Sequence, residues 1–144
     1  MKEKYGNSFG GSSESMKLGV SSPWIRVDEF YPGGAMVKVG DYKETTSQTI
    51  KVGDKIPLGT PIYMAGLGSK AYFTSDTNVI GNEVMPTLAG LTYEDAYVGE
   101  EGCSLTIVTR GTLKNEDLEN PFGSRNSEEV NALKELRTIG ITIV

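Results

Sequence analysis

The side chains best suited to chemistry in this sequence are two pairs of adjacent carboxylates, Glu94-Asp95 and Glu100-Glu101. Neighbouring carboxylates can perform general acid–base catalysis when burial shifts one of their pKa values. Both pairs lie in expected loops, and the second is flanked by glycines. We therefore interpret both carboxylate pairs as solvated turn residues and not as a catalytic dyad.

The other nucleophile candidate is Cys103, the only cysteine of the chain. A nucleophilic cysteine needs a nearby base, and the sequence contains no histidine. The absence of histidine also removes Ser-His-Asp catalysis and the common histidine metal sites. We expect Cys103 to be a small apolar filler, and a single cysteine allows no internal disulfide.

Two further patterns superficially indicate ligand sites. Gly68-Ser69-Lys70 resembles the end of a phosphate-binding loop but lacks the upstream glycine and the Gly-Lys-Ser/Thr order. Asp76, Asn78 and Glu83 offer oxygen ligands, but their spacing does not match a helix–loop–helix calcium site. An ordinary turn capped by Asp76 is the expected structure. No catalytic, cofactor-binding or metal-binding residue is predicted.

Composition narrows the function classes further. The 144 residues suffice for one domain with its own core, and 38% hydrophobic with 23% charged residues is typical of a globular chain. The net charge of −5 disfavours binding to phosphate backbones, so we expect no nucleic-acid partner. No window approaches the roughly 20 apolar residues of a membrane helix, and residues 1–19 lack the apolar core of a signal peptide.

Short strands separated by turns are expected to build the domain around the stretch Lys51–Met64. Gly53-Asp54 is a turn signal, and Pro57 and Gly59 suit the second and fourth positions of a further turn. Tyr31-Pro32-Gly33-Gly34 fits a type II turn. Expected strands are 35–39, 42–52, 62–64, 71–74, 89–93, 96–98, 104–113 and 141–144.

A single C-terminal helix is predicted before the last strand. Asn126 and Glu129 form a capping box, and Gly140 is placed to stop the helix. The expected buried stripe is Val130, Leu133 and Leu136. The apolar strand that follows must pair within a sheet. The predicted fold class is a β-rich α+β domain, a small mixed sheet or barrel-like structure with one C-terminal helix and a terminal strand.

Residues 1–22 are predicted to form a flexible N-terminal arm. The run from Gly6 to Ser15 is rich in Gly, Ser and Asn, and it cannot bury enough apolar surface to offset the entropy of ordering. Two interpretations are open, a flexible terminus and an arm that orders on a partner. Tyr5, Phe9 and Leu18 would anchor such an arm.

Residues 23–50 are predicted to be a strand-rich attachment segment ahead of the main domain, 51–144. It begins with Pro23-Trp24-Ile25, the first stretch that favours burial. Trp24 is the only tryptophan, and a lone tryptophan is more often a core or interface anchor than a ligand platform.

Residues 52–144 resemble the head decoration and head fibre proteins of tailed bacteriophages, of the lambda decoration-protein type. Four pieces in the family's order carry the resemblance: Ile56–Tyr63 (IPLGTPIY), Ala89–Asp95 (AGLTYED), Leu105–Leu113 (LTIVTRGTL), and the closing helix with Leu133, Leu136 and Gly140–Ile143 (GITI). The chain departs from the compact family pattern before Lys51, where the strand-rich segment and the arm occur.

The resemblance implies a non-enzymatic α/β domain on the outside of a phage head. Such proteins are made in the host cytoplasm and clamp the lattice of the major capsid protein, often as homotrimers and in some head fibre relatives as homodimers. Multivalent attachment to a lattice allows modest contacts per subunit. The residues expected to bind the capsid or another partner are Phe9, Leu18, Pro23, Trp24, Ile25, Phe30 and Tyr31.

Two other function classes remain open from the residues alone. The first is a small carbohydrate- or ligand-binding module, for which six tyrosines could supply stacking faces: Tyr31, Tyr42, Tyr63, Tyr72, Tyr93 and Tyr97. The second is a small trimeric β-rich enzyme such as a nucleotide hydrolase. That enzyme would need clustered carboxylates for magnesium beside a glycine-rich phosphate loop, and the sequence does not show both together.

Overall fold

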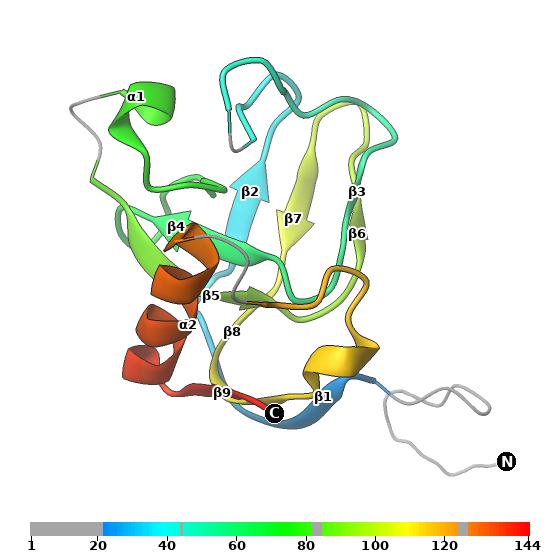
Figure 1. Ribbon diagram of the computed structural model, residues 1–144. Coiled ribbons are helices and arrows are strands. Elements are labelled where there is room, and N and C mark those ends of the chain that lie inside the picture. Colours follow the sequence, from blue (N-terminus) through cyan, green and yellow to red (C-terminus); the bar gives the residue numbers. More distant parts are fainter. Residues whose placement is uncertain (1–21, 44, 82–84, 124–126) are drawn as a thin grey trace, which may run out of the picture.

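The computed structural model describes residues 22–43, 45–81, 85–123 and 127–144, without the side chains of residues 127–132. The expected arm, apart from Ser22, lies outside the described residues, as do Asn126 and Glu83. Figure 1 shows short strands in several directions, with one long helix against one side.

A mixed five-stranded sheet forms the centre of the described chain. Its strand order is β1 (Trp24–Phe30), β8 (Ile107–Leu113), β5 (Thr87–Thr92) and β4 (Pro61–Met64). The fifth strand, β9 (Ile141–Ile143), pairs with residues 111–113 of β8, past the end of β8 that pairs with β5. The β8–β9 pair is parallel, and the other pairs are antiparallel. The predicted β-rich α+β fold is thereby confirmed, with an open sheet rather than a closed barrel.

Two small antiparallel ribbons flank this sheet in the upper half of Figure 1. One ribbon pairs β2 (Ala35–Val37) with β7 (Cys103–Leu105), and the other pairs β3 (Lys55–Ile56) with β6 (Ala96–Tyr97). The helical elements are α1 (Thr77–Ile80), the 3₁₀ turn η2 (Asn115–Asp117) and α2 (Ser127–Ile139).

Both faces of the sheet are buried, so the domain has two cores. The ribbon-side core consists of Ala35, Val37, Ile50, Ile56, Ile62, Met64, Ala71, Ala89, Val98, Leu105 and Ile107. The helix-side core consists of Trp24, Leu88, Leu91, Val108, Leu113, Leu118, Leu136 and Ile141. Adjacent residues of a strand point to opposite faces, and Ile107 and Val108 accordingly enter different cores.

The single strand expected over 104–113 is two strands in the structure. β7 pairs with β2, whereas β8 pairs with β1, β5 and β9, and the chain changes sheets at Thr106. Leu105 and Ile107 nevertheless share one core, as residues two apart in an extended segment should. The choice between pairing partners depends on distant segments, so the sequence pattern did not show the break.

The strands expected over 42–52 and 71–74 were wrong. The first segment is a loop closed by one bridge between Tyr42 and Thr49. The second contributes one bridge, between Tyr72 and Tyr63 of β4. Thr-rich composition favours extended backbone, but among the described residues neither segment pairs with a strand beyond these single bridges.

The predicted turns form, with one shift in register. Gly34 N–H donates to the Tyr31 carbonyl at 3.1 Å and Gly33 has φ +77°, as a type II turn requires. Near Pro57 the turn lies one residue later than expected. Thr60 N–H donates to the Pro57 carbonyl at 3.3 Å, and Gly59, with φ +88°, takes the third position.

Helix α2 ends where the sequence predicted. Gly140 has φ +113°, and its N–H donates to the Leu136 carbonyl at 3.0 Å. Leu136 is fully buried and Leu133 is half-buried. Val130 belongs to the helix, but its side chain lies outside the described part.

The proposed boundary at residue 50 does not separate two structural units. β1 joins the central sheet through β8, and β2 joins a ribbon through β7. Ile50 itself is buried in the ribbon-side core. Residues 23–50 and 51–144 therefore share one folded domain.

Candidate functional site

The best candidate for a functional site is the exposed side of β1, the strand that follows residues 1–22. β1 pairs with β8 on one side, and no described strand pairs with its outer edge. Five of its side chains are exposed and are called the β1 surface here: Ile25, Arg26, Asp28, Glu29 and Phe30. Ile25 is 60% exposed and Phe30 is 45% exposed, so apolar groups on this surface are available to a partner.

Trp24, at the start of β1, is a core anchor and not a free contact residue. It is 8% exposed and packs in the helix-side core. Its indole Nε1–H donates to the Tyr93 carbonyl at 3.1 Å, which satisfies its polar atom. Of the two anchor positions expected for Trp24, core or interface, the structure shows the core. In the described chain its ring fixes the start of β1 and offers little surface to a partner.

The other predicted contact residues occupy different environments. Phe30 packs edge-on against Tyr93, with ring centroids 5.2 Å apart and an interplanar angle of 87°. Tyr31 is half-buried against the ribbon-side core, and its N–H donates to the Ile107 carbonyl at 2.7 Å. Pro23 is half-buried, and its carbonyl accepts from Lys114 N–H at 2.8 Å. Phe9 and Leu18 lie outside the described residues.

Charged side chains occupy the middle of the β1 surface. Arg26 Nε and Asp28 Oδ2 are 3.1 Å apart, and both side chains are largely solvated. Glu29 lies 3.7 Å from the Arg110 guanidinium of β8, and its carbonyl accepts from the Thr109 hydroxyl. The β1 surface thus combines apolar ends with a charged centre, which is a pattern suited to binding a protein.

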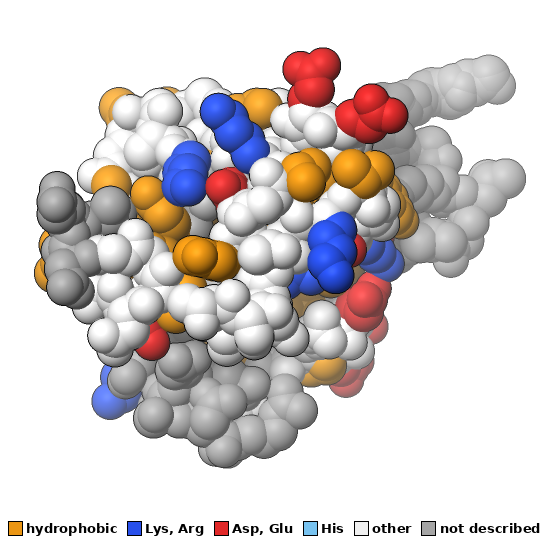
Figure 2. Space-filling view, turned by 90° about the horizontal axis from the view of Figure 1, so that it is seen from above, with side chains coloured by type: hydrophobic (Ala, Val, Ile, Leu, Met, Phe, Trp, Pro, Cys, Tyr) orange, Lys and Arg blue, Asp and Glu red, His pale blue; other side chains and the backbone are white. Residues whose placement is uncertain are grey.

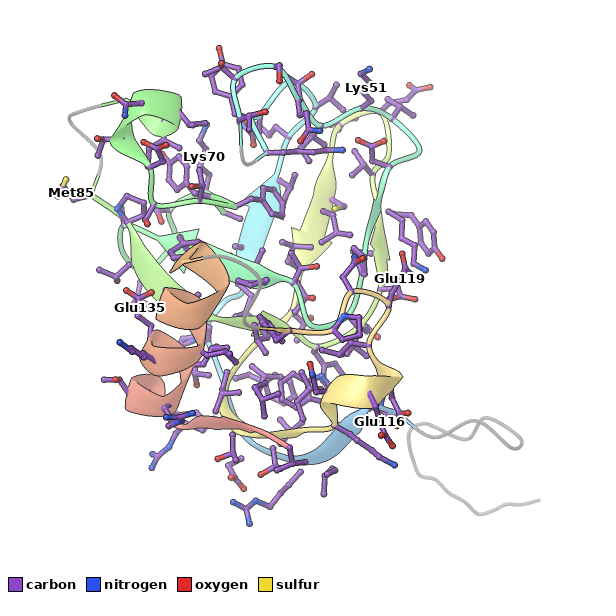
Figure 3. The ribbon with its side chains drawn as sticks, in the orientation of Figure 1. Lys51, Lys70, Met85, Glu116, Glu119 and Glu135 are labelled. Atoms are coloured by element: carbon purple, nitrogen blue, oxygen red, sulfur yellow. The ribbon has the colours of Figure 1, made fainter. Side chains whose placement is uncertain are left out.

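The carboxylate pairs are structural or solvated. Asp95 accepts from Leu58 N–H at 2.8 Å and lies 3.6 Å from Lys55 Nζ, which also contacts Glu119 at 2.6 Å. Figure 3 shows Glu119 beside β3 and β6. The hydrogen bond from Lys55 to Glu119, aided by the charges of Asp95 and Glu119, raises the pKa of Lys55. Glu100 and Glu101 are exposed within the turn closed by Gly99 and Gly102.

Cys103 is a poor nucleophile in this setting. It lies half-buried in β7 and packs against the ribbon-side core. Burial raises the pKa of its thiol, so the reactive thiolate is disfavoured at neutral pH. The expectation of a packing role agrees with this placement.

The rejected ligand motifs also have structural roles. Ser69 Oγ accepts from the N–H groups of Ala65 and Gly66, which closes that loop on itself, and Lys70 pairs with Asp41 at 3.3 Å. Asp76 accepts from Asn78 N–H at 2.9 Å and caps α1. Across the described residues, no group of three or more potential ligands is arranged to hold a metal ion. Among the described helices, none has both the length and the apolar character needed to cross a bilayer.

A small groove between α2, β9 and the segment after η2 could not be found from the sequence. It has a volume of about 180 Å³ and is lined by Asn115, Phe122, Leu133, Arg137, Ile141, Thr142 and Ile143. Small-molecule sites usually measure about 300–1,000 Å³, so this groove fits at most a side chain. The Asn115 amide, one of its polar lining groups, is already bonded twice to the Phe122 backbone.

The face opposite β1, at the top of Figure 1, offers no comparable surface. Seen from above (Figure 2), its described hydrophobic side chains form small separate groups among polar and charged atoms. Tyr42 and Tyr97 are exposed but come from different segments, the loop after β2 and strand β6.

No known protein-family model matches this chain, and no curated protein matches it.

Proposed function

We propose that this protein is a structural subunit of a tailed-bacteriophage head, bound to the outer face of the capsid as a decoration or head fibre protein. The observation that carries the proposal is the position of β1. It is an edge strand with exposed Ile25 and Phe30, and it directly continues residues 1–22. An extended terminal segment can add as a strand to an exposed sheet edge of the shell, and the apolar side chains of β1 lie next to that segment in the chain.

The four pieces that resemble the decoration family meet in one part of the fold. Ile56–Tyr63 runs from β3 into β4, Ala89–Asp95 covers most of β5, and Leu105–Leu113 contains β8. The closing helix and Gly140–Ile143 correspond to α2 and β9. β4, β5, β8 and β9 belong to the central sheet and α2 packs against β5 and β9, which supports reading the four pieces as parts of a single fold pattern.

In this proposal the folded domain and residues 1–22 both contact the capsid. The Pro23 carbonyl is held by Lys114 N–H, so the chain leaves the domain from a fixed point at the start of β1. Residues of the arm that order on the capsid each lose about 1–2 kcal/mol of conformational entropy. Firm contacts are therefore expected only around apolar anchors such as Phe9 and Leu18, together with Ile25 and Phe30.

The partners in this proposal are the major capsid protein and further copies of the chain, at the virion exterior. We propose no catalytic activity for the protein. Asp95 and Glu119 both contact Lys55, and Asp95 also accepts a hydrogen bond from the backbone of Leu58. An acidic chain with these contacts suits a building block better than an enzyme or a nucleic-acid binder.

The deciding experiment compares the full chain with a variant lacking residues 1–22 in co-sedimentation with capsids of the same phage. The full chain should sediment with the capsids and the truncated chain should remain in solution. The thermal midpoints of the two free proteins should be nearly equal, because the described domain keeps both cores.

Two substitutions on the β1 surface refine this test. Ile25→Asp and Phe30→Asp should reduce capsid binding of the full chain, whereas Glu135→Arg, on the exposed side of α2 (Figure 3), should not. Undiminished sedimentation of the truncated chain would show that the domain docks without the arm. Absence of the full-length protein from purified virions would refute the proposed function.

A further inference from the structure

The middle of β1 is complementary to a second copy of itself. Read in antiparallel register about Val27, the sequence Trp24–Phe30 places each Arg26 opposite the other copy's Asp28. Val27 then lies opposite Val27. Opposite charges directly across an antiparallel ladder stabilise it, whereas like charges destabilise it.

We propose that two copies of this protein pair through the outer edges of β1, antiparallel and centred on Val27, to form a dimer with a continuous sheet. This inference rests on the self-association that is part of the proposed function, and it specifies the interface. A twofold axis makes every contact occur twice, so a self-complementary strand is sufficient to define it.

The charges are placed for such a pairing. Arg26 and Asp28 form an ion pair at 3.1 Å within one chain, so both side chains lie on the same face of β1. Their side chains are 68% and 45% exposed, and thus free to reach across an edge. In the dimer the four charges would alternate in sign around a square, with each arginine next to two aspartates. A network of this kind is more effective than an isolated surface ion pair.

The irregularity of β1 limits the length of the interface. Its pairing with β8 is regular only at Arg26 and Val27, opposite Thr112 and Gly111, and the register shifts on both sides of this stretch. Bulges of this kind discourage indiscriminate pairing of an edge strand. The paired stretch in the dimer is therefore short. The ion pairs between Arg26 and Asp28, rather than the length of the ladder, select its register.

Edge pairing is compatible with attachment to a capsid. It uses backbone groups at the rim of the sheet, whereas side chains of the β1 surface project above and below it. The two N-terminal segments would leave the dimer from opposite ends of the paired strands. One dimer would then offer two attachment arms, which raises avidity without any new contact.

Charge reversal tests the interface in the full-length protein without capsids present. Arg26→Asp and Asp28→Arg each turn both symmetric pairs from attractive to repulsive, and each should weaken dimerisation about tenfold or more. The double variant with both substitutions restores the complementarity and should restore the dimer. Sedimentation-velocity dilution series measure the dissociation constants. Lys134→Glu and Glu135→Arg, exposed charges on α2, are the matched controls and should leave the constants unchanged.

A cysteine scan in a Cys103→Ser background provides a second measurement. Val27→Cys should form an intermolecular disulfide under mild oxidation, because residues at the centre of a twofold ladder face their own copies within disulfide range. Ile25→Cys, which would lie opposite Glu29, should crosslink much less.

Several results would overturn the inference. These are a monomeric or trimeric wild-type chain, single reversals without effect, or a double variant no better than the singles. Because the oligomeric state is measured without capsids, such a result leaves capsid attachment standing. Conversely, an intact dimer that fails to bind capsids would remove the proposed function and keep the interface.

Discussion

Leu136 is the residue through which α2 should contribute most to stability. It is fully buried and packs in the helix-side core with Leu91, Val108 and Ile141. The sequence also placed Leu133 on the buried stripe, but that side chain is only half-buried. We therefore expect Leu136→Ala to be the more damaging of the two substitutions.

The magnitude follows from the buried volume. Leu→Ala removes the equivalent of about three methylene groups, worth roughly 2.4 kcal/mol at about 0.8 kcal/mol each. A residual cavity of roughly 60 Å³ adds about 1.5 kcal/mol at about 24 cal/mol per Å³. The free energy of unfolding should thus fall by about 4 kcal/mol, and the thermal midpoint by about 10 °C. Leu133→Ala should cost about half as much.

Urea denaturation followed by tryptophan fluorescence suits this measurement. Trp24 is the only tryptophan and lies in the same core as Leu136, so its emission reports directly on the affected packing. Glu135→Ala, on the exposed side of the same helix, controls for changes in helix propensity. An unchanged midpoint for Leu136→Ala, or a larger loss for Leu133→Ala, would mean that α2 presents a different face to the sheet.

Two further predictions concern the backbone and the pH dependence. Gly34→Ala should lower the free energy of unfolding by more than about 1 kcal/mol, since Gly34 has φ +60° and a Cβ there meets the Leu105 carbonyl. Gly33→Ala, which has open space around it, should cost less. Equal losses for the two variants in urea denaturation would contradict the steric argument. The hydrogen bond from Lys51 N–H, assisted by Lys43, lowers the pKa of Asp54. The contribution of Asp54 to stability is therefore complete above the unfolded-state pKa and is lost as pH falls through the folded-state pKa. NMR titration of the Asp54 carboxyl should give a lowered pKa. A midpoint at or above the ordinary aspartate value would refute the prediction.

Local signals in the sequence were sufficient for much of the fold. The Tyr31–Gly34 turn, the end of α2 at Gly140 and the apolar strand after it all follow from residues close in the chain. In each case the conformation depends on steric preferences or burial that a few neighbouring residues determine. The sequence indicated that Trp24 anchors either a core or an interface, and its burial in the helix-side core came from the structure.

What could not be predicted depends on pairing between distant segments. The break at Thr106 arises because β7 and β8 have different partner strands. The loop over 42–52 has strand-like composition but lacks a neighbouring strand. For the candidate site, the sequence identified Ile25 and Phe30. That β1 is an edge strand, and hence open to a partner, emerged only from the sheet order.

The position of β8 between the two cores has a consequence for how the domain comes apart. Ile107 and Val108 anchor opposite faces of one strand, and that strand pairs with β1, β5 and β9. Neither core can melt without exposing β8, and the ribbons belong to the ribbon-side core, so partial opening should be confined to exposed loops and turns. Amide protons of β8 should then exchange with solvent only through global unfolding, and their exchange rates would report the total stability of the domain.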